Sequence, residues 1–248
     1  MPVALTAWTT AGALGTAALA GLLRGFTGFG LALFAVPALT LVAEPIEAVP
    51  CVILLQVIAG LQLLPRTWRD ADWRALAPLL AAALLATPLG TLLLDDVAAD
   101  PMRAVIGAVV LLAVVLLGRG VAARDEPGLG VKLAIGAVSG LLNGSTAMAG
   151  PPVIVYFLAT QRTAAASRAS LLMYFFVLSL AGAVSVSAAG LVTARTLLLA
   201  ALMFPAVVAG NALGDRFFGR ASPDVYRRIA LAVLTLLALL ALLRAVLG

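Results

Sequence analysis

The residues best suited to bind a ligand in this sequence lie in two short glycine-rich stretches. The first, residues 24–30, reads RGFTGFG, and the second, residues 143–152, reads NGSTAMAGPP. Arginine carries a permanent positive charge, serine and threonine donate from hydroxyl groups, and glycine lets backbone N–H groups turn toward a ligand. This combination of groups predicts a binding site for a small anion.

The candidate anion site combines residues of both stretches with two polar residues elsewhere. We expect Arg24 to supply the charge and Asn143 to be its counterpart in the second stretch. Gln56 and Asn211 lie within apolar runs, where they either line a cavity or form hydrogen bonds between helices. The predicted substrate-binding residues are Arg24, Gly25, Thr27, Gly28, Gly30, Gln56, Asn143, Gly144, Ser145, Thr146, Gly150, Pro151 and Asn211.

The residue types needed for catalysis are scarce in this chain. It has no histidine, a single cysteine at Cys51 and a single lysine at Lys132. No pair of carboxylates falls within an apolar run, and no phosphate-binding loop with its lysine is present. The sequence therefore predicts a protein that is not an enzyme and that holds no metal and no cofactor.

The composition predicts an integral membrane protein. Of the 248 residues, 63% are hydrophobic and only 11% are charged, which leaves too little polar side chain to cover a soluble protein. The apolar runs lack a two-residue alternation, so we expect membrane-spanning helices. The net charge of +5 comes from arginines in short loops, where membrane topology explains them and nucleic-acid binding is not required.

Ten apolar runs follow one another along the chain, and three are too short to cross a bilayer. A spanning helix needs about 20 residues. The runs at 31–43, 131–142 and 151–160 fall short of this, and they flank the two glycine-rich stretches. We therefore expect two broken hairpins, over residues 5–43 and 131–160, with their tips at the glycines.

A weak internal repeat divides the chain near its middle. The segment AGLLRG at 20–25 aligns with SGLLNG at 139–144, and the order of element types is the same in both halves. We predict an all-helical polytopic protein of two inverted repeats, each a re-entrant hairpin plus three spanning helices, about eight spans by hydropathy. The repeats are assigned to residues 1–120 and 133–248, and a cytoplasmic linker to 121–132.

The positions of the arginines predict the orientation in the membrane. Positive residues gather in cytoplasmic loops, which places the loops near 66–74, 119–132, 162–168 and 216–228 inside. Both termini are then external, and the two hairpins enter from opposite sides. Their tips are expected to meet near the middle of the membrane, where broken helices require a cavity and helix N-termini attract anions.

Each feature of the tips also has a plainer interpretation. Glycines in membrane helices often permit close helix packing, so GFTGF is also typical of a contact face. Arg24 follows an apolar run and is also placed to extend its side chain to the cytoplasmic surface. The hydroxyl groups at the tips are also suited to capping helix ends.

Four segments together resemble the TauE/SafE family of sulfite and organosulfonate exporters. They are GLLRGFTGFGLALFAVPAL at 21–39, DADWRALAPLL at 70–80, SGLLNGSTAMAGPPVIVYFLA at 139–159 and SRASLLMYFF at 167–176. The resemblance implies a duplicated permease of the bacterial inner membrane for small sulfur-containing anions. The family's glycine and proline motifs fall on Gly25, Gly28, Gly30, Pro37, Gly140, Gly144, Gly150, Pro151 and Pro152. Many members have more glycine where this chain has STAM at 145–148.

We therefore expect a secondary transporter that exports sulfite, sulfoacetate or a related organosulfonate by rocking one half of the molecule against the other. An anion channel is an alternative of the same class. A membrane accessory subunit without transport activity, held to its neighbours by glycine-rich faces, is an alternative of a different class. The expected partners are the anion and the lipid bilayer, and a homo-oligomer is left open.

Overall fold

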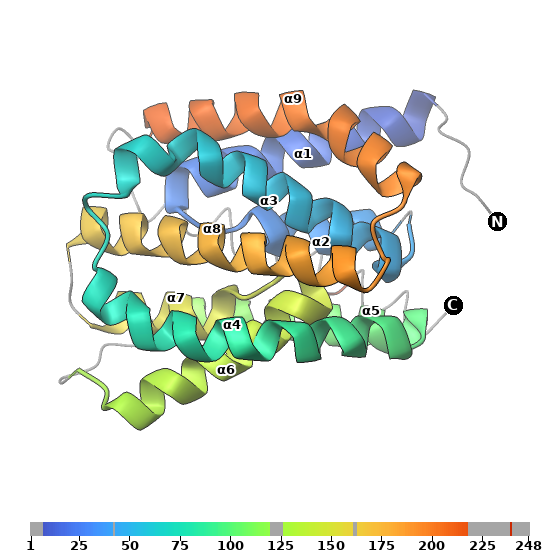
Figure 1. Cartoon of the computed structure of the whole chain (residues 1–248). Helices are drawn as coiled ribbons and strands as arrows, with labels where there is room; N and C mark the ends of the chain where they lie inside the picture. The colour runs from blue at the N-terminus through green and yellow to red at the C-terminus, as the bar shows by residue number, and fades with distance from the viewer. Residues whose placement is uncertain (1–6, 42, 120–125, 161–162, 218–238, 240–248) are drawn as a thin grey trace.

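A computed structural model describes residues 7–41, 43–119, 126–160, 163–217 and 239 of the chain (Figure 1). The described residues form nine helices and no strand. The helices are α1 (Ala7–Thr27), α2 (Leu31–Thr40), α3 (Pro45–Thr67), α4 (Trp73–Asp96), α5 (Ala99–Arg119), α6 (Leu129–Thr146), α7 (Gly150–Ala159), α8 (Ala164–Ala188) and α9 (Ala194–Phe217). The tenth apolar run, at 228–247, lies outside the described residues apart from residue 239.

Local sequence signals set several of the helix starts. The Asp72 carboxylate accepts a hydrogen bond from the Ala75 backbone N–H at 3.0 Å and so caps α4. Thr163 caps α8 through the Ala166 N–H at 3.2 Å. Prolines occupy the first turns of α3 and α7, where their missing N–H groups have no helical partner to lose.

Four of the described helices are long and apolar enough to cross a membrane. They cover Pro45–Pro65, Trp73–Asp96, Ala165–Ala188 and Ala194–Phe217. Large apolar side chains point outward from these helices, and Leu85 on α4 is 80% exposed. A soluble protein rarely exposes apolar surface in this way, whereas lipid covers it without cost. The protein is therefore a multi-pass membrane protein made of helices.

The two expected hairpins are present, but their breaks are narrower than the sequence analysis predicted. The first was placed at residues 24–30, yet α1 continues to Thr27 and the chain leaves the helix only at 28–30. The second was placed at 143–150, yet α6 continues to Thr146. Hydroxyl groups of Thr27 and Thr146 donate to carbonyls one turn earlier, so both hydroxyl groups are satisfied within the last turn of their helices.

The helix α6 is also longer than its apolar run of 131–142 indicated. It has 18 residues and begins at Leu129, inside the range that the sequence analysis assigned to a linker. Its last turn is made of small and polar residues, which a hydropathy window does not count as membrane-embedded. These residues remain helical because they are buried in the protein and do not face lipid.

In each hairpin the first helix, α1 or α6, is the outer arm, and the second, α2 or α7, is the inner arm. Glycines join each outer arm to a helix from the other half of the chain. On α1, a Cβ added at Gly21 would collide with the backbone carbonyl of Val207 on α9. On α6, a Cβ added at Gly140 would collide with the backbone carbonyl of Ala83 on α4. In both pairs the partners run parallel, because successive glycines meet successive turns of the neighbouring helix. We call these two contacts the α1/α9 pair and the α4/α6 pair.

The two pairs lie on opposite sides of a central layer that contains α3 and α8 (Figure 1). The helices α4 and α9 run in opposite directions in this view, so the two hairpins enter the bundle from opposite ends. Within the central layer, Gly60 of α3 lies against the ring of Phe176 of α8, where even a methyl group would be too close. The short inner arms α2 and α7 lie inside this frame, next to α5.

Candidate functional site

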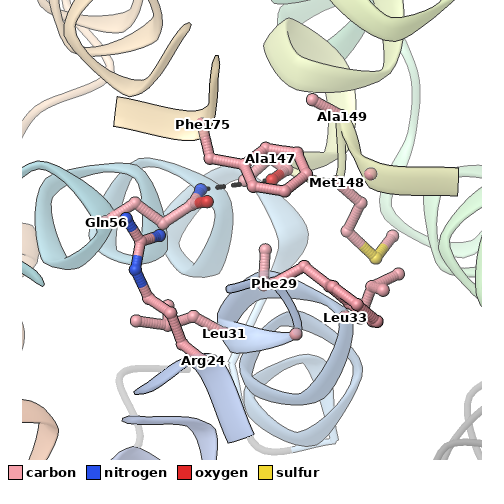
Figure 2. A pocket seen from close by; sticks show the side chains of 12 residues that line it. Arg24, Phe29, Leu31, Leu33, Gln56, Ala147, Met148, Ala149 and Phe175 are labelled. Carbon is pink, nitrogen blue, oxygen red and sulfur yellow. Dashed lines mark hydrogen bonds between the residues drawn. The ribbon is translucent and has the colours of Figure 1, made fainter. Parts of the chain in front are cut away.

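A small cavity lies where the breaks of the two hairpins face each other (Figure 2). It measures about 270 Å³ including its open mouth, and its enclosed part has room for about one water molecule. The residues that line it come from both hairpins and from α3 and α8. They are Arg24, Phe29, Gly30, Leu31, Ala32, Leu33, Gln56, Ala147, Met148, Ala149, Gly150 and Phe175.

Arg24 is the charged group among these lining residues. Its side chain is buried, with 1% of the residue exposed, and lies beside Gln56 in Figure 2. The Nε and Nη2 atoms are buried and have no hydrogen-bond partner among the described residues. A buried cation without a counter-charge costs several kcal/mol by desolvation. This arrangement therefore fits a group that is completed by an anionic ligand.

The burial of Arg24 also decides between two interpretations of its position. A side chain extended to the cytoplasmic surface would be exposed, and this one is enclosed by protein. The guanidinium lies near Gln56, which is close to the middle of the spanning helix α3. The charge is therefore held inside the bundle and not at one of its ends.

The break of the first hairpin brings the N-terminus of α2 to the cavity. Gly28 and Gly30 have φ angles of 85° and 106°, which side chains rarely adopt, so glycine is needed at both positions. Gly30 precedes α2, and the first N–H groups of that helix have no helical partner. These groups add hydrogen-bond donors to the side of the cavity that holds Arg24.

The break of the second hairpin is held by hydrogen bonds from α3 and from the hairpin's own helix α6. Ala147 has a φ of 58° and is the non-glycine residue with positive φ in the described chain. Its carbonyl accepts a hydrogen bond from Gln56 Nε2 of α3 at 3.2 Å, drawn in Figure 2. The Ser139 hydroxyl donates to the Ala149 carbonyl at 2.6 Å. The left-handed turn is thus fixed by its surroundings, which offset its intrinsic cost.

Four of the thirteen predicted site residues line this cavity, namely Arg24, Gly30, Gln56 and Gly150. Thr27 instead bonds the Leu23 carbonyl at 2.6 Å, and Ser145 and Thr146 bond carbonyls one turn earlier in α6. These hydroxyl groups serve the helix ends. Pro151 lies in the first turn of α7, one residue beyond the lining.

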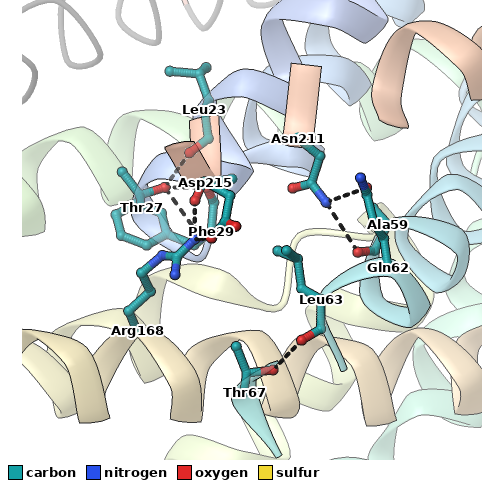
Figure 3. Close-up of polar contacts among 11 residues, drawn as sticks. Leu23, Thr27, Phe29, Ala59, Gln62, Leu63, Thr67, Arg168, Asn211 and Asp215 are labelled. Atoms are coloured by element: carbon teal, nitrogen blue, oxygen red, sulfur yellow. Dashed lines mark hydrogen bonds and ion pairs between the residues drawn. The ribbon is translucent and has the colours of Figure 1, made fainter. Parts of the chain in front are cut away.

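The other predicted residues belong to contacts between helices. Gly25 and Gly144 lie against the backbones of α9 and α4, and Gly28 lies against Arg168. Asn143 donates to the Leu178 carbonyl of α8 at 3.0 Å. Asn211 donates to the Ala59 carbonyl at 3.3 Å and to Gln62 Oε1 at 2.8 Å (Figure 3). The packing interpretation therefore holds for Gly25 and Gly144, which lie inside helices, whereas Gly28 and Gly30 form the break of the first hairpin.

Arg168 joins the first hairpin to α9, which the sequence analysis did not foresee because it placed this residue in a cytoplasmic loop. The Nη2 atom donates to the Gly25 carbonyl. It also donates to Asp215 Oδ1 at 2.9 Å (Figure 3). The Gly25 carbonyl is one of the last in α1, where a cation is favoured by the helix dipole. Arg168 thus fixes the end of α1 that carries Arg24.

Sequence reasoning also missed the apolar lining of the cavity. Phe29 lies between two glycines and Met148 lies two residues before Gly150, so their proximity to the breaks was a usable signal. Phe175 lies within a uniformly apolar run of α8, where no local pattern distinguishes a residue that faces the cavity. Across the described chain, no three His, Cys, Asp or Glu side chains come together in a way that would hold a metal ion.

Comparison with known proteins identifies the chain at the level of family. Neither a curated protein nor a solved structure matches it. A family model described as sulfite exporter TauE/SafE matches residues 13–241, which include most of α1 and all of α2 to α9. Members of this family are transporters, which agrees with a membrane bundle in which Arg24 faces a cavity with no partner for its Nε and Nη2 atoms among the described residues. The match covers nearly the whole chain, and this protein therefore belongs to the sulfite exporter TauE/SafE family.

Proposed function

We propose that this protein is a secondary transporter that exports a small anion, such as sulfite or an organosulfonate, across the bacterial inner membrane. The observation that carries this proposal is Arg24, a buried guanidinium with unpartnered nitrogen atoms that faces the cavity between the two hairpin tips. An anion there would supply the missing counter-charge, and the N–H groups at the start of α2 would share it.

The helix arrangement supports two inverted repeats around that site. The α1/α9 pair and the α4/α6 pair use the same contact, glycine against a backbone carbonyl, and the two hairpins enter from opposite ends. Arg69 and Arg74 precede or begin α4, whereas Asp95 and Asp96 end it, which favours a cytoplasmic start for that helix. The predicted external termini lie outside the described residues, and a reporter fused to residue 248 tests them.

The same pairs change which parts we expect to move. A rocking motion of one sequence half against the other would pull both glycine contacts apart, because each pair joins the two halves. We infer instead that α1, α3 and α9 move together against α4, α6 and α8, with sliding between α3 and α8. Each moving unit then carries one hairpin tip, and their relative motion opens the cavity to one side or the other.

Transport by purified protein tests the site directly. Proteoliposomes loaded with labelled sulfite, at a pH low enough that hydrogen sulfite is the main species, should lose it through the wild-type chain, and Arg24→Gln should reduce this efflux to the background. Arg24→Lys keeps the charge but loses the planar donor group, so partial efflux is expected. Arg69→Gln, at an exposed arginine before α4, is the matched control and should leave efflux unchanged.

Undiminished efflux by a folded Arg24→Gln variant would exclude Arg24 as the anion-binding group. Faster efflux when the same anion is present outside would distinguish a carrier from a channel, because exchange requires a site that alternates between the two sides. Complete lack of efflux and of anion binding by the purified chain would favour the accessory-subunit alternative. The natural chain has one cysteine, so cross-links between α3 and α8 in a Cys51→Ala background test the proposed motion.

A further inference from the structure

We propose that the cavity selects a monovalent anion with a short apolar end and no ammonium group, that is, a simple alkyl sulfonate in preference to a dianion or an amino sulfonate. This inference rests on the proposed function, since it assumes that the anion binds beside Arg24. It follows from the charge balance of the cavity and from the side chains that form the wall beyond the guanidinium.

The charge balance of the cavity is that of a single cation. Among the described lining residues Arg24 is the one charged side chain. The N-termini of α2 and α7 bring partial positive charge to the tips, but the C-termini of α1 and α6 end at the same places with the opposite sign. Pro151 and Pro152 also remove N–H donors from the start of α7. A dianion would therefore leave one negative charge without compensation.

The wall beyond the guanidinium is apolar. It is formed by side chains from both hairpins and from α8, namely Phe29, Leu31, Leu33, Met148 and Phe175. Apart from Arg24, the polar side chain among the described lining residues is that of Gln56, and its amide nitrogen already donates to the Ala147 carbonyl. No carboxylate is found among the described residues that line the cavity, so an ammonium group would lose its hydration without gaining a counter-charge.

The apolar end is expected to have only a few carbon atoms, because the enclosed part of the cavity is small and the tips must separate further for each carbon that is added. Its enclosed part holds about one water molecule, so the tips must separate slightly to admit any anion. Burial of each additional methylene is expected to tighten binding about fourfold while the chain still fits. An ammonium at the same position should weaken binding by at least about tenfold, because a buried polar group without a partner is costly.

Binding to the purified full-length chain in nanodiscs tests this selectivity. Methanesulfonate, ethanesulfonate, 1-propanesulfonate, taurine, sulfoacetate and sulfate are titrated at pH 7.5 by calorimetry. We expect Kd to fall from methanesulfonate to 1-propanesulfonate, and taurine to bind at least about tenfold more weakly than ethanesulfonate, which has the same carbon chain. Sulfoacetate and sulfate should be the weakest of the sulfur anions.

A pair of variants on α2 locates the effect. Leu33→Ala removes part of the apolar wall and so enlarges the cavity, which should shift the tightest binding to a longer sulfonate. Leu39→Ala removes a side chain of the same type from the same helix outside the cavity, and it should leave the order of the anions unchanged. A loss of affinity that is equal for all anions in both variants would indicate general damage and would contradict the assignment of the wall.

The failures of the two proposals are distinguishable. If sulfate, sulfoacetate or taurine binds as tightly as ethanesulfonate, and Arg24→Gln abolishes that binding, the selectivity proposed here is wrong and the anion site stands. If ethanesulfonate binds equally well to the wild type and to Arg24→Gln, the anion site itself is wrong and this inference falls with it. Absence of binding by all six anions overturns the selectivity proposed here, and it overturns the anion site as well if the wild type also fails to release sulfite.

Discussion

The two hairpins carry different polar residues at the same place in their outer arms. In α1 the segment GLLR ends at Arg24, and in α6 the segment GLLN ends at Asn143. Both residues are buried. Asn143 reaches the Leu178 carbonyl of the neighbouring α8 and is satisfied there. The longer Arg24 side chain extends into the cavity, where its Nε and Nη2 atoms meet no acceptor among the described residues.

This difference shows how two similar helix pairs can form a site with a single charge. The surrounding glycine contacts are alike, since Gly21 and Gly25 lie against α9 as Gly140 and Gly144 lie against α4. The glycine contacts therefore set the direction in which Arg24 points in α1 and Asn143 points in α6. The side chain itself then decides whether that position closes a contact between helices or binds a ligand.

The largest expected effect is the loss of stability on substitution of the contact glycines. It tests whether the α1/α9 pair and the α4/α6 pair are equivalent. Gly21→Ala and Gly140→Ala each place a methyl group against a backbone carbonyl of the paired helix, which cannot move aside alone. We expect each to lower the free energy of unfolding by about 2–4 kcal/mol, through overpacking. Thermal unfolding of the purified variants measures this.

The matched control for these glycines is Gly15→Ala on the same helix α1. No atom lies within 4 Å of the added Cβ, and alanine favours helix, so stability should rise by up to about 1 kcal/mol. A large loss in one pair together with full tolerance in the other would show that the two glycine contacts are not equivalent.

The next prediction is that substitution of the two polar residues changes the free energy of unfolding in opposite directions. Arg24→Met removes a buried and unpaired charge, so it should raise the free energy of unfolding by about 1–3 kcal/mol while transport is lost. Asn143→Ala removes a satisfied donor and should lower it by about 1 kcal/mol while folded protein still transports. Unfolding and efflux are measured on the same preparations, and shifts of the same sign in both variants would contradict the comparison.

A smaller effect concerns the backbone of the two breaks. The first break uses glycines at its positive φ angles, whereas the second uses Ala147 at a φ of 58°. Ala147→Gly relieves that conformation and should stabilise the fold by up to about 1 kcal/mol, after the entropy of the unfolded glycine is subtracted. Ala149→Gly, at an ordinary helical φ of −61°, should destabilise it. Melting temperatures that change in the same direction would refute this explanation.

The smallest effect is a pH dependence at the open end of the second hairpin. Glu126 lies before α6, and its Oε1 accepts from Lys132 Nζ at 2.9 Å and from the Tyr156 hydroxyl at 3.3 Å. The hydrogen bond to Lys132 lowers the pKa of Glu126 below its usual 4.5. The stabilising contribution is therefore present above pH 4.5 and is lost as the pH falls through the lowered pKa.

A comparison of the wild type with Glu126→Gln measures this contribution. The difference in melting temperature should be small and constant between pH 8 and pH 6, because the carboxylate is largely exposed and its pairing is screened by solvent. It should shrink as the pH falls below about 4.5. A difference that grows on acidification would show that the carboxylate does not stabilise the hairpin in its charged form.

The helices and the approximate places of the breaks were predictable from the sequence. The apolar runs at 46–64, 75–94 and 196–213 correspond to α3, α4 and α9. Glycine and proline marked both breaks, because backbone freedom and the missing N–H are properties of the residue itself. The extent of the breaks was not predictable, since Arg24 and Asn143 are compatible with either helix or turn and only burial keeps them helical.

The sequence by itself determined that the chain is a bundle of membrane helices with two glycine-rich breaks and an arginine beside the first. Hydropathy and backbone freedom are local properties, so both can be determined from each segment separately. The tertiary structure decided which glycines face a neighbouring helix, which residues form the apolar wall, and that Arg24 stays without a partner in the described chain while Asn143 finds one. These outcomes depend on the rotation of each helix about its axis, which is set by close packing against helices from the other half of the chain.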